Sequence, residues 1–472
     1  MQYQRLMLIS ATLLLVACGA KDTPRDADLT AGALPGAVPT KGFVSEAEAG
    51  AVADGWLKTF NDPQLEKLVA EAIVGNRDLA VMNARLDQAA SRARQAGADL
   101  KPQVSLAAGA NAGGSGNAPH TEQMGAGLTM TWEIDVWGRM SAGVRAAQEA
   151  YASTAADTAF ARESLAAQVV KGWFLAIQAV QQEDIVSRGA ELRKRNMEIA
   201  TERNRVGKAS ATDVALARAD YAEAQDAVEK AKSGRENAAR SLEVLLGRYP
   251  SAELTIAAKL PVLPPPPPAG LPSQLMERRP DLVAATRRVA SAFNQVESAK
   301  AARYPRFAIT ADAGALSQDF KSMSLNDAFW NLGANMLGPI FDGGRLKEQV
   351  IIETAKQDEA LALYGKAALE TFRQVEQALT ESRRLITRVD LLASAEKNQN
   401  KAERLTKKRF DAGTIDQLTL ILVQERALLA RLASLAIQVE ALTNRVNFHL
   451  SLGGGFELPP STPEDQSPPS KA

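Results

Sequence analysis

The stretch MGAGLTMTWEIDVWGR, residues 124–139, changes from one periodicity to another within a few residues. In its first part every second residue is apolar or alanine, and glycine, threonine and glutamate stand between them, which is the two-residue period of a strand. Asp135, Gly138 and Arg139 follow, and a long interval rich in strong helix formers and free of proline then begins. The stretch therefore predicts a strand that runs through a sharp turn into a long helix.

The same pattern returns in the second half of the chain. GPIFDGGR at 338–345 answers WEIDVWGR at 132–139. RYPRFAITADAGA likewise answers LKPQVSLAAGA, with Pro305 lying 203 residues after Pro102. Matches at a nearly constant offset indicate a tandem duplication.

Each repeat is expected to contain a first helix, then two strands, then long helices. No proline lies between Pro119 and Pro250 or between Pro339 and Pro459, and apolar residues recur in both intervals at the spacings of a coiled coil. The repeats are assigned to residues 42–250 and 273–455, the proline-rich connector to 251–272, and the strands to 102–112, 123–135, 305–316 and 329–341.

The four strand segments share one apolar face and one small or polar face. Each has roughly the 9–11 residues that a tilted membrane strand needs. Trp132, Trp137 and Trp330 lie near strand ends, as in an interfacial aromatic belt. The pattern favours membrane strands, with an amphipathic hairpin packed on a soluble core as the alternative. Because the smallest bacterial outer-membrane barrels have about eight strands, membrane strands here require an oligomer, in which two copies would give eight strands and three would give twelve.

The N-terminus has the features of an export signal. The apolar run after Arg5 is too short to span a bilayer, so residues 1–17 are predicted to be a signal peptide. LVAC, which ends at Cys18, resembles the bacterial lipobox and implies a covalent lipid on that cysteine, with a free thiol as the alternative. A lipidated tether is assigned to residues 18–41 and a disordered tail to residues 456–472.

Composition argues against several classes of function. The 55 lysines and arginines balance 55 aspartates and glutamates, so the net charge is +0 and nothing in it points to a nucleic-acid partner. One cysteine excludes a disulfide within the chain. Because only two histidines are present, His120 and His449, and because no Walker motif or redox pair occurs, we expect no metal site, no cofactor and no enzyme activity.

Several longer segments resemble a known family. GWLKTFNDPQLEKLVAEAI, LPSQLMERRPDLVAA and AARYPRF, with the pair WEIDVWGR and GPIFDGGR, are similar to the TolC-type outer-membrane efflux proteins, in the lipoprotein branch of OprM and NodT. The resemblance covers residues 41–455 and implies an α+β membrane protein. Its expected assembly is a homotrimer with a 12-stranded transmembrane β-barrel, four strands per chain, continued by a long periplasmic α-helical barrel.

The resemblance also implies a function. A protein of this kind is the passive exit duct of a tripartite efflux pump in the outer membrane of a Gram-negative bacterium. It is surrounded by outer-membrane lipids, and its partners are a periplasmic adaptor and an inner-membrane transporter of the RND type. One rival is a structural or adhesive coiled-coil lipoprotein, which explains the helices and Cys18 but not the strands or the duplication. A lipid-anchored periplasmic hydrolase is a second rival, without a convergent set of catalytic residues to support it.

Two polar motifs are expected where a strand turns into a long helix. An aspartate there can accept hydrogen bonds from helix N-terminal amides, and glycine permits the abrupt change of backbone direction. Catalysis by these carboxylates is the alternative, but the motif recurs in both repeats without a nucleophile or histidine nearby. The residues assigned to the turns are Asp135, Gly138, Arg139, Asp342, Gly344 and Arg345.

The remaining candidate residues lie at the helix–helix turns around Gly207 and Gly413. In the family, the helix after the second turn lines a closed periplasmic aperture, often with an aspartate six or nine residues beyond the glycine. This chain has Thr419 and Leu422 there. Together with Leu418 they are predicted to form an apolar gate that blocks ions by dewetting. The alternative packs the leucines in the coiled-coil seam. The residues assigned to inter-helix ion pairs at the gate are Asp416, Glu425 and Arg426, with a solvated charged face as the alternative.

Overall fold

The computed structural model describes residues 32–34, 42–45, 50–114, 116, 121–270, 272–317 and 327–456. The first repeat forms η1 (Trp56–Phe60), α3 (Pro63–Gly75), α4 (Arg77–Ala98), β1 (Gln103–Gly113), β2 (Thr121–Ile134), α5 (Arg139–Arg205) and α6 (Ala211–Leu245). The second forms α7 (Pro272–Arg278), α8 (Pro280–Ala301), β3 (Arg306–Ser317), β4 (Asp327–Leu337), α9 (Arg345–Asp411) and α10 (Gln417–Ser451).

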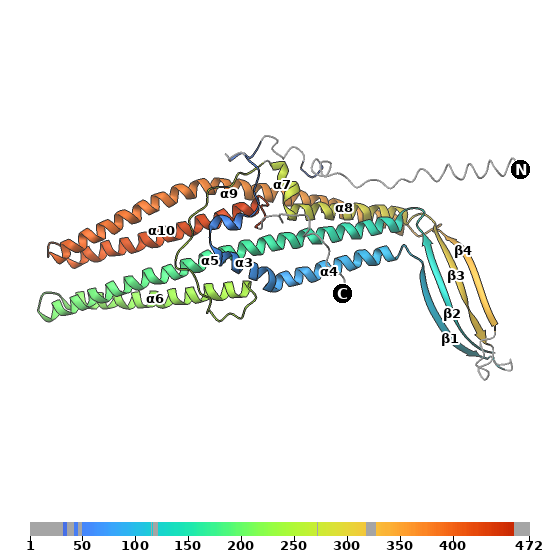
Figure 1. Ribbon diagram of the computed structural model, residues 1–472, viewed down its shortest axis with the longest axis horizontal. Helices are drawn as coiled ribbons and strands as arrows, with labels where there is room; N and C mark the ends of the chain where they lie inside the picture. Colours follow the sequence, from blue (N-terminus) through green and yellow to red (C-terminus); the bar gives the residue numbers. More distant parts are fainter. Residues whose placement is uncertain are drawn as a thin grey trace. The chain divides into compact units, whose positions relative to one another are not determined.

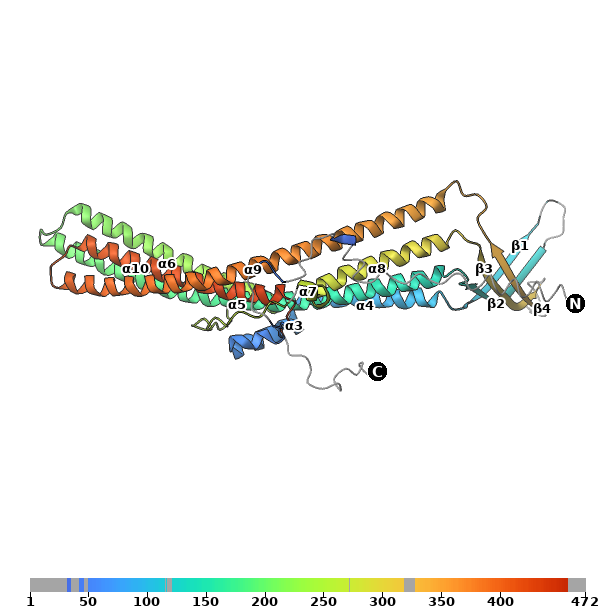
Figure 2. The ribbon, with the colours of Figure 1, turned by 90° about the horizontal axis from the view of Figure 1, so that it is seen from above.

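The two repeats contain helices of matching length. α5 and α9 each have 67 residues, α6 and α10 each have 35, and α4 and α8 each have 22. A tight turn joins α5 to α6 and α9 to α10, and each pair lies side by side as a helical hairpin (Figures 1 and 2). The helices of the described residues contain no apolar segment of membrane-spanning length.

The described residues divide into two units. One holds the sheet with residues 32–34, 84–157 and 281–367, and the other holds residues 42–83, 158–280 and 368–456. The helices α5 and α9 contribute residues to both units.

The sheet of the first unit is antiparallel, with the order β1-β2-β3-β4 (Figure 1). Its register places apolar residues opposite one another, as in Leu106 opposite Leu128 and Trp132 opposite Ile309. β1 and β4 form the two edges. The sheet therefore combines the hairpins of both repeats through a central β2–β3 pairing.

One predicted strand boundary is wrong. β4 ends at Leu337 and not at residue 341. Pro339 has no N–H to donate to a strand partner, and a Cβ on Gly338 would lie 3.0 Å from Pro305. The alternation of apolar residues continues past the point at which the backbone can pair.

The helices α5 and α8 pack closely in the unit that holds the sheet. Three serine hydroxyls donate across this interface to backbone carbonyl oxygens, and Ala142 and Ala146 are buried in it. The three bonds run from Ser153 to Ala284 (3.0 Å), from Ser291 to Ala146 (2.8 Å) and from Ser298 to Arg139 (2.9 Å). Small side chains let the two backbones approach closely enough for these contacts.

The core of the second unit contains an aromatic cluster among leucine, valine and alanine side chains. Trp173 and Phe174 of α5 are fully buried beside Trp56 and Phe60. The Trp173 Nε1–H donates to Asp62 (2.8 Å), whose other carboxylate oxygen accepts the first backbone amides of α3. One aspartate thus caps a helix and satisfies a buried indole.

Candidate functional sites at the helix turns

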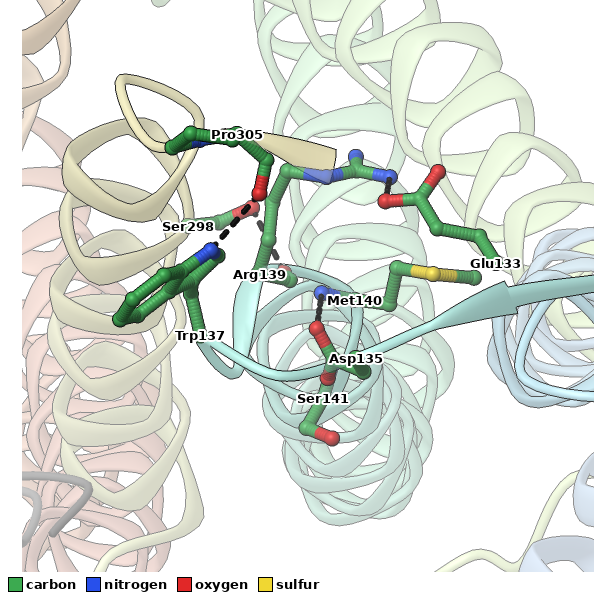
Figure 3. A network of polar contacts seen from close by, with 8 residues as sticks. All are labelled: Glu133, Asp135, Trp137, Arg139, Met140, Ser141, Ser298 and Pro305. Atoms are coloured by element: carbon green, nitrogen blue, oxygen red, sulfur yellow. Dashed lines mark hydrogen bonds and ion pairs between the residues drawn. The ribbon is translucent and has the colours of Figure 1, made fainter. Parts of the chain in front are cut away.

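The first strand-to-helix turn is closed by Asp135 (Figure 3). Its carboxylate accepts hydrogen bonds from the backbone N–H groups of Met140 (3.0 Å) and Ser141 (2.7 Å) in the first turn of α5. Gly138 has φ +73°, in the left-handed region that glycine adopts without strain. Partial burial acts to raise the pKa of Asp135, but the hydrogen bonds from Ser141 and Met140 outweigh it and hold that pKa below its usual value. The carboxylate is therefore charged and serves the helix terminus.

Arg139 and Trp137 connect this turn to the rest of the unit (Figure 3). The Arg139 guanidinium pairs with Glu133 at 2.7 Å. The Trp137 indole N–H donates to the Pro305 carbonyl oxygen (2.7 Å), and its ring stacks on Tyr304 at 4.9 Å. These contacts position the end of β2 and the start of α5 against the segment before β3.

The turn of the second repeat has the same plan. Asp342 accepts hydrogen bonds from the backbone N–H groups of Gly344 (2.9 Å) and Leu346 (2.9 Å), which lower its pKa. Gly343 and Gly344 both have left-handed φ values, and Arg345 is exposed. Both aspartates thus accept hydrogen bonds from backbone amides and stabilise the turn at the start of the long helix that follows.

At the helix–helix turns, Gly207 and Gly413 have nearly the same φ, 73° and 72°. Ser210 caps α6 in a capping box with Asp213, and Asp416 caps α10 by accepting from the Thr419 N–H at 2.7 Å. Within one chain the Asp416 carboxylate serves as the helix cap, and its membership of a gate ion pair stays a prediction. An aspartate three residues before an N3 amide is a common N-terminal cap, and that signal was available in the sequence.

The predicted gate leucines project away from their own chain. Leu418 is 63% exposed and Leu422 is 47% exposed, whereas Leu420 between them is 4% exposed and packs inward. Thr419 is also exposed, although its backbone N–H is bound to Asp416. Within one chain, the leucines do not pack in the seam of the α9–α10 hairpin.

Polar contacts join α5 to α10 near this end, and so connect the hairpins of the two repeats. Glu425 lies 4.0 Å from Arg193. The Gln417 amide donates to the Asn196 carbonyl oxygen (2.9 Å). Arg193 was not singled out from the sequence, because an arginine on a long polar helix gives no signal of its partner. Arg426 is exposed.

A buried basic pair in the second unit was also missed. Arg445 is 2% exposed, and its Nη2 donates to the Ser382 hydroxyl at 3.4 Å. His449, one helical turn later, is 5% exposed and stacks on Trp56 with ring centroids 5.6 Å apart. Burial, and then the charge of Arg445, lower the pKa of His449 to about 4. The imidazole is therefore neutral at pH 7.

Cys18 lies outside the described residues. Within those residues, no group of three or more His, Cys, Asp or Glu side chains is placed to hold a metal ion.

Comparison with known proteins gives these sites their context. The family model of the outer membrane efflux proteins matches residues 68–248 and again residues 271–454, one match in each repeat. The chain belongs to the outer membrane efflux protein family. As such, it is the outer-membrane exit duct of an efflux pump.

Members of the outer membrane efflux protein family resemble the chain over nearly its whole length. The pyoverdine export outer membrane protein OpmQ of Pseudomonas aeruginosa is 28% identical over 473 residues, covering 97% of this chain and 98% of OpmQ. The structure of the outer-membrane channel OprN has a TM-score of 0.80 and 26% identity, covering 93% of this chain and 99% of that one. The Campylobacter jejuni CmeC channel, at 23% identity and a TM-score of 0.84 over 95% and 97% of the two chains, shares the fold.

Proposed function

We propose that the duct is a passive channel formed by three copies of the chain. Three four-stranded sheets would supply twelve strands to one transmembrane β-barrel, and the long helices would continue it as a periplasmic helical barrel. The observation that carries this proposal is the pair of sheet edges, β1 and β4, in a sheet made of two repeated hairpins. In lipid the backbone groups of an edge need partners, and closure of the sheet supplies them.

The duplication specifies how the edges would pair. Ala108 pairs with Ala126 in the first hairpin, and Ala311 pairs with Leu332 in the second, so these pairs correspond. The central β2–β3 pairing should then recur between β4 of one copy and β1 of the next.

Two central pairs supply the expected register. Leu128 opposite Ala313 and Met130 opposite Ala311 are observed. The correspondence of Ala126 with Leu332 carries Leu128 and Met130 of β2 to Ala334 and Met336 of β4. The correspondence of Ala311 with Ala108 carries Ala313 and Ala311 of β3 to Ala110 and Ala108 of β1. Across the boundary between copies, Ala334 should therefore lie opposite Ala110, and Met336 opposite Ala108. Both pairs match apolar faces, as a shared lipid-facing surface requires.

A gate at the periplasmic end is the second part of the proposal. Leu418 and Leu422 are exposed in one chain, and in a trimer they would stack around the axis with Thr419 beside them. Such an apolar ring blocks ions without a ring of charges. The Arg193–Glu425 pair would help to hold the two hairpins of each chain together below it.

The partners follow from the family. A duct that carries no energy source needs an inner-membrane transporter, here of the RND type, and a periplasmic adaptor that joins the two. OpmQ is named for pyoverdine export, which supports a small exported molecule as cargo rather than a protein.

Reconstitution separates this function from that of a structural coiled-coil lipoprotein. The purified protein is expected to migrate as a heat-sensitive trimer and to make liposomes permeable to small solutes when Leu418 and Leu422 are replaced by serine. If the wild type and the double serine variant were both monomeric and both left the vesicles sealed, the structural coiled-coil lipoprotein would be favoured.

Lipidation of Cys18 is proposed as an auxiliary anchor. Because the strands themselves would hold the trimer in the bilayer, Cys18→Ser behind a cleavable non-lipid signal is expected to leave trimers in the outer membrane fraction. Membrane fractionation with native electrophoresis measures this. Soluble periplasmic monomer as the sole product would contradict the strand-based anchor.

A further inference from the structure

Two described pieces of the N-terminal region contact α9. We call residues 32–34 and 42–45 together the N-terminal strap. Each piece lies against α9 within its own unit. Each contact depends on a particular residue of α9, a buried glycine in one case and a carboxylate in the other.

The first contact explains a glycine inside a helix. Gly365 is buried in the middle of α9, where a Cβ would lie 2.9 Å from the carbonyl oxygen of Ala33. Leu34, the next residue, is 5% exposed. Glycine weakens a helix interior relative to alanine. Its presence here matches the close approach of the strap backbone.

The second contact is charge-assisted. The two carboxylate oxygens of Glu376 on α9 accept hydrogen bonds from the backbone N–H groups of Val44 (2.6 Å) and Ser45 (2.9 Å). The Ser45 hydroxyl also lies 3.1 Å from that of Thr380, one turn further along. Partial burial acts to raise the pKa of Glu376, but the bonds from Ser45 and Val44 prevail and lower it. The ionised carboxylate thus holds two successive amides, a strong arrangement.

We propose that α9 carries a docking site for the chain's own N-terminal strap, and that Gly365 and Glu376 hold the strap to this helix. The consequence for the anchor rests on the lipidation proposed above. Residues 19–31 lie between the proposed lipid and the first contact of the described residues, and a segment of that length could span at most about 45 Å. Along α9, the rise from Arg345 to Leu361, which lies beside Gly32, is about 24 Å. The docked strap therefore lets the acyl chains reach the level of the strand-to-helix turn.

Limited proteolysis of the full-length protein tests the second contact. A glutamine at position 376 can accept only one of the two amides, so Glu376→Gln should raise the rate of tryptic cleavage between Lys41 and Gly42 about tenfold. Glu359→Gln is the matched control, since Glu359 is exposed on the same helix. It should leave the rate unchanged.

A second variant tests the first contact. Gly365→Ala should favour the helix yet displace the strap, so that elastase cleaves after Ala33 several-fold faster. Gly234→Ala in α6 is the control, because nothing lies within 4 Å of its Cβ position. Wild-type cleavage rates in both Glu376→Gln and Gly365→Ala would overturn the docking site. The same assay on Cys18→Ser protein, with the mass of the N-terminal peptide, distinguishes a failure of lipidation from a failure of docking.

Discussion

Replacing Leu418 and Leu422 together by serine is expected to raise the single-channel conductance about tenfold or more. Both side chains are exposed on the chain that carries them, at 63% and 47%, so the change costs little packing within the protomer. If three copies bring them together at the axis, hydroxyl groups there allow water and ions to fill the constriction. Conductance in planar bilayers, at fixed salt, measures the effect.

The duplication supplies a matched control for the gate. Leu216 lies nine residues after Gly207, as Leu422 lies nine after Gly413, and it is 60% exposed on α6. Leu216→Ser removes an equivalent leucine from the other hairpin and should change conductance little. The constriction would lie elsewhere if Leu216→Ser raised the conductance as much as the double variant of Leu418 and Leu422 does, or if that double variant left the conductance unchanged.

Acid is expected to destabilise the second unit through His449. Its pKa is about 4 in the folded chain, below the ordinary value of 6.5, because of burial and the nearby Arg445. Between pH 6.5 and pH 4 the imidazole is therefore protonated in the unfolded chain but neutral in the folded chain. The free energy of unfolding consequently falls as the pH drops from 6.5 to 4. The expected loss of unfolding free energy is about 3 kcal/mol, constant below pH 4.

Denaturation in detergent at a series of pH values measures this loss. Carboxylates titrate in the same range, so the informative quantity is the difference between the wild type and His449→Phe, which keeps a ring against Trp56 without a titrating nitrogen. His120→Gln replaces the only other histidine and should behave as the wild type does. The pH dependence attributed to His449 would be refuted if His449→Phe lost as much stability as the wild type.

Periodicity explains why most elements could be predicted. The alternation in residues 124–134 and the proline-free intervals are local signals, and the duplication repeats each of them. The end of β4 was misplaced because alternation alone does not report whether each backbone N–H is available. Pro339 ends the pairing while the side-chain pattern continues.

At the candidate sites, too, the contacts between residues close in the sequence could be predicted and those between distant residues could not. Asp135 and Asp342 lie next to the helix termini that they cap, so their contacts were accessible from short-range sequence. Asp416 also acts over three residues, but it was interpreted as an ion-pair member. Arg193 with Glu425, and Glu376 with the strap, join residues more than 200 positions apart. Such pairings depend on how the hairpins pack and have no local signature.

The trimeric barrel is tested most directly by a disulfide between copies. In a Cys18→Ser background, Ala110→Cys with Ala334→Cys should give a covalent trimer under mild oxidation, because residues opposite each other in antiparallel strands lie within disulfide range. β1 and β4 are opposite edges of the sheet, so this bond forms between copies. Ala110→Cys with Asn335→Cys, one residue out of register, should stay monomeric on denaturing gels. Monomers from both pairs, or equal cross-linking by both, would contradict the proposed barrel.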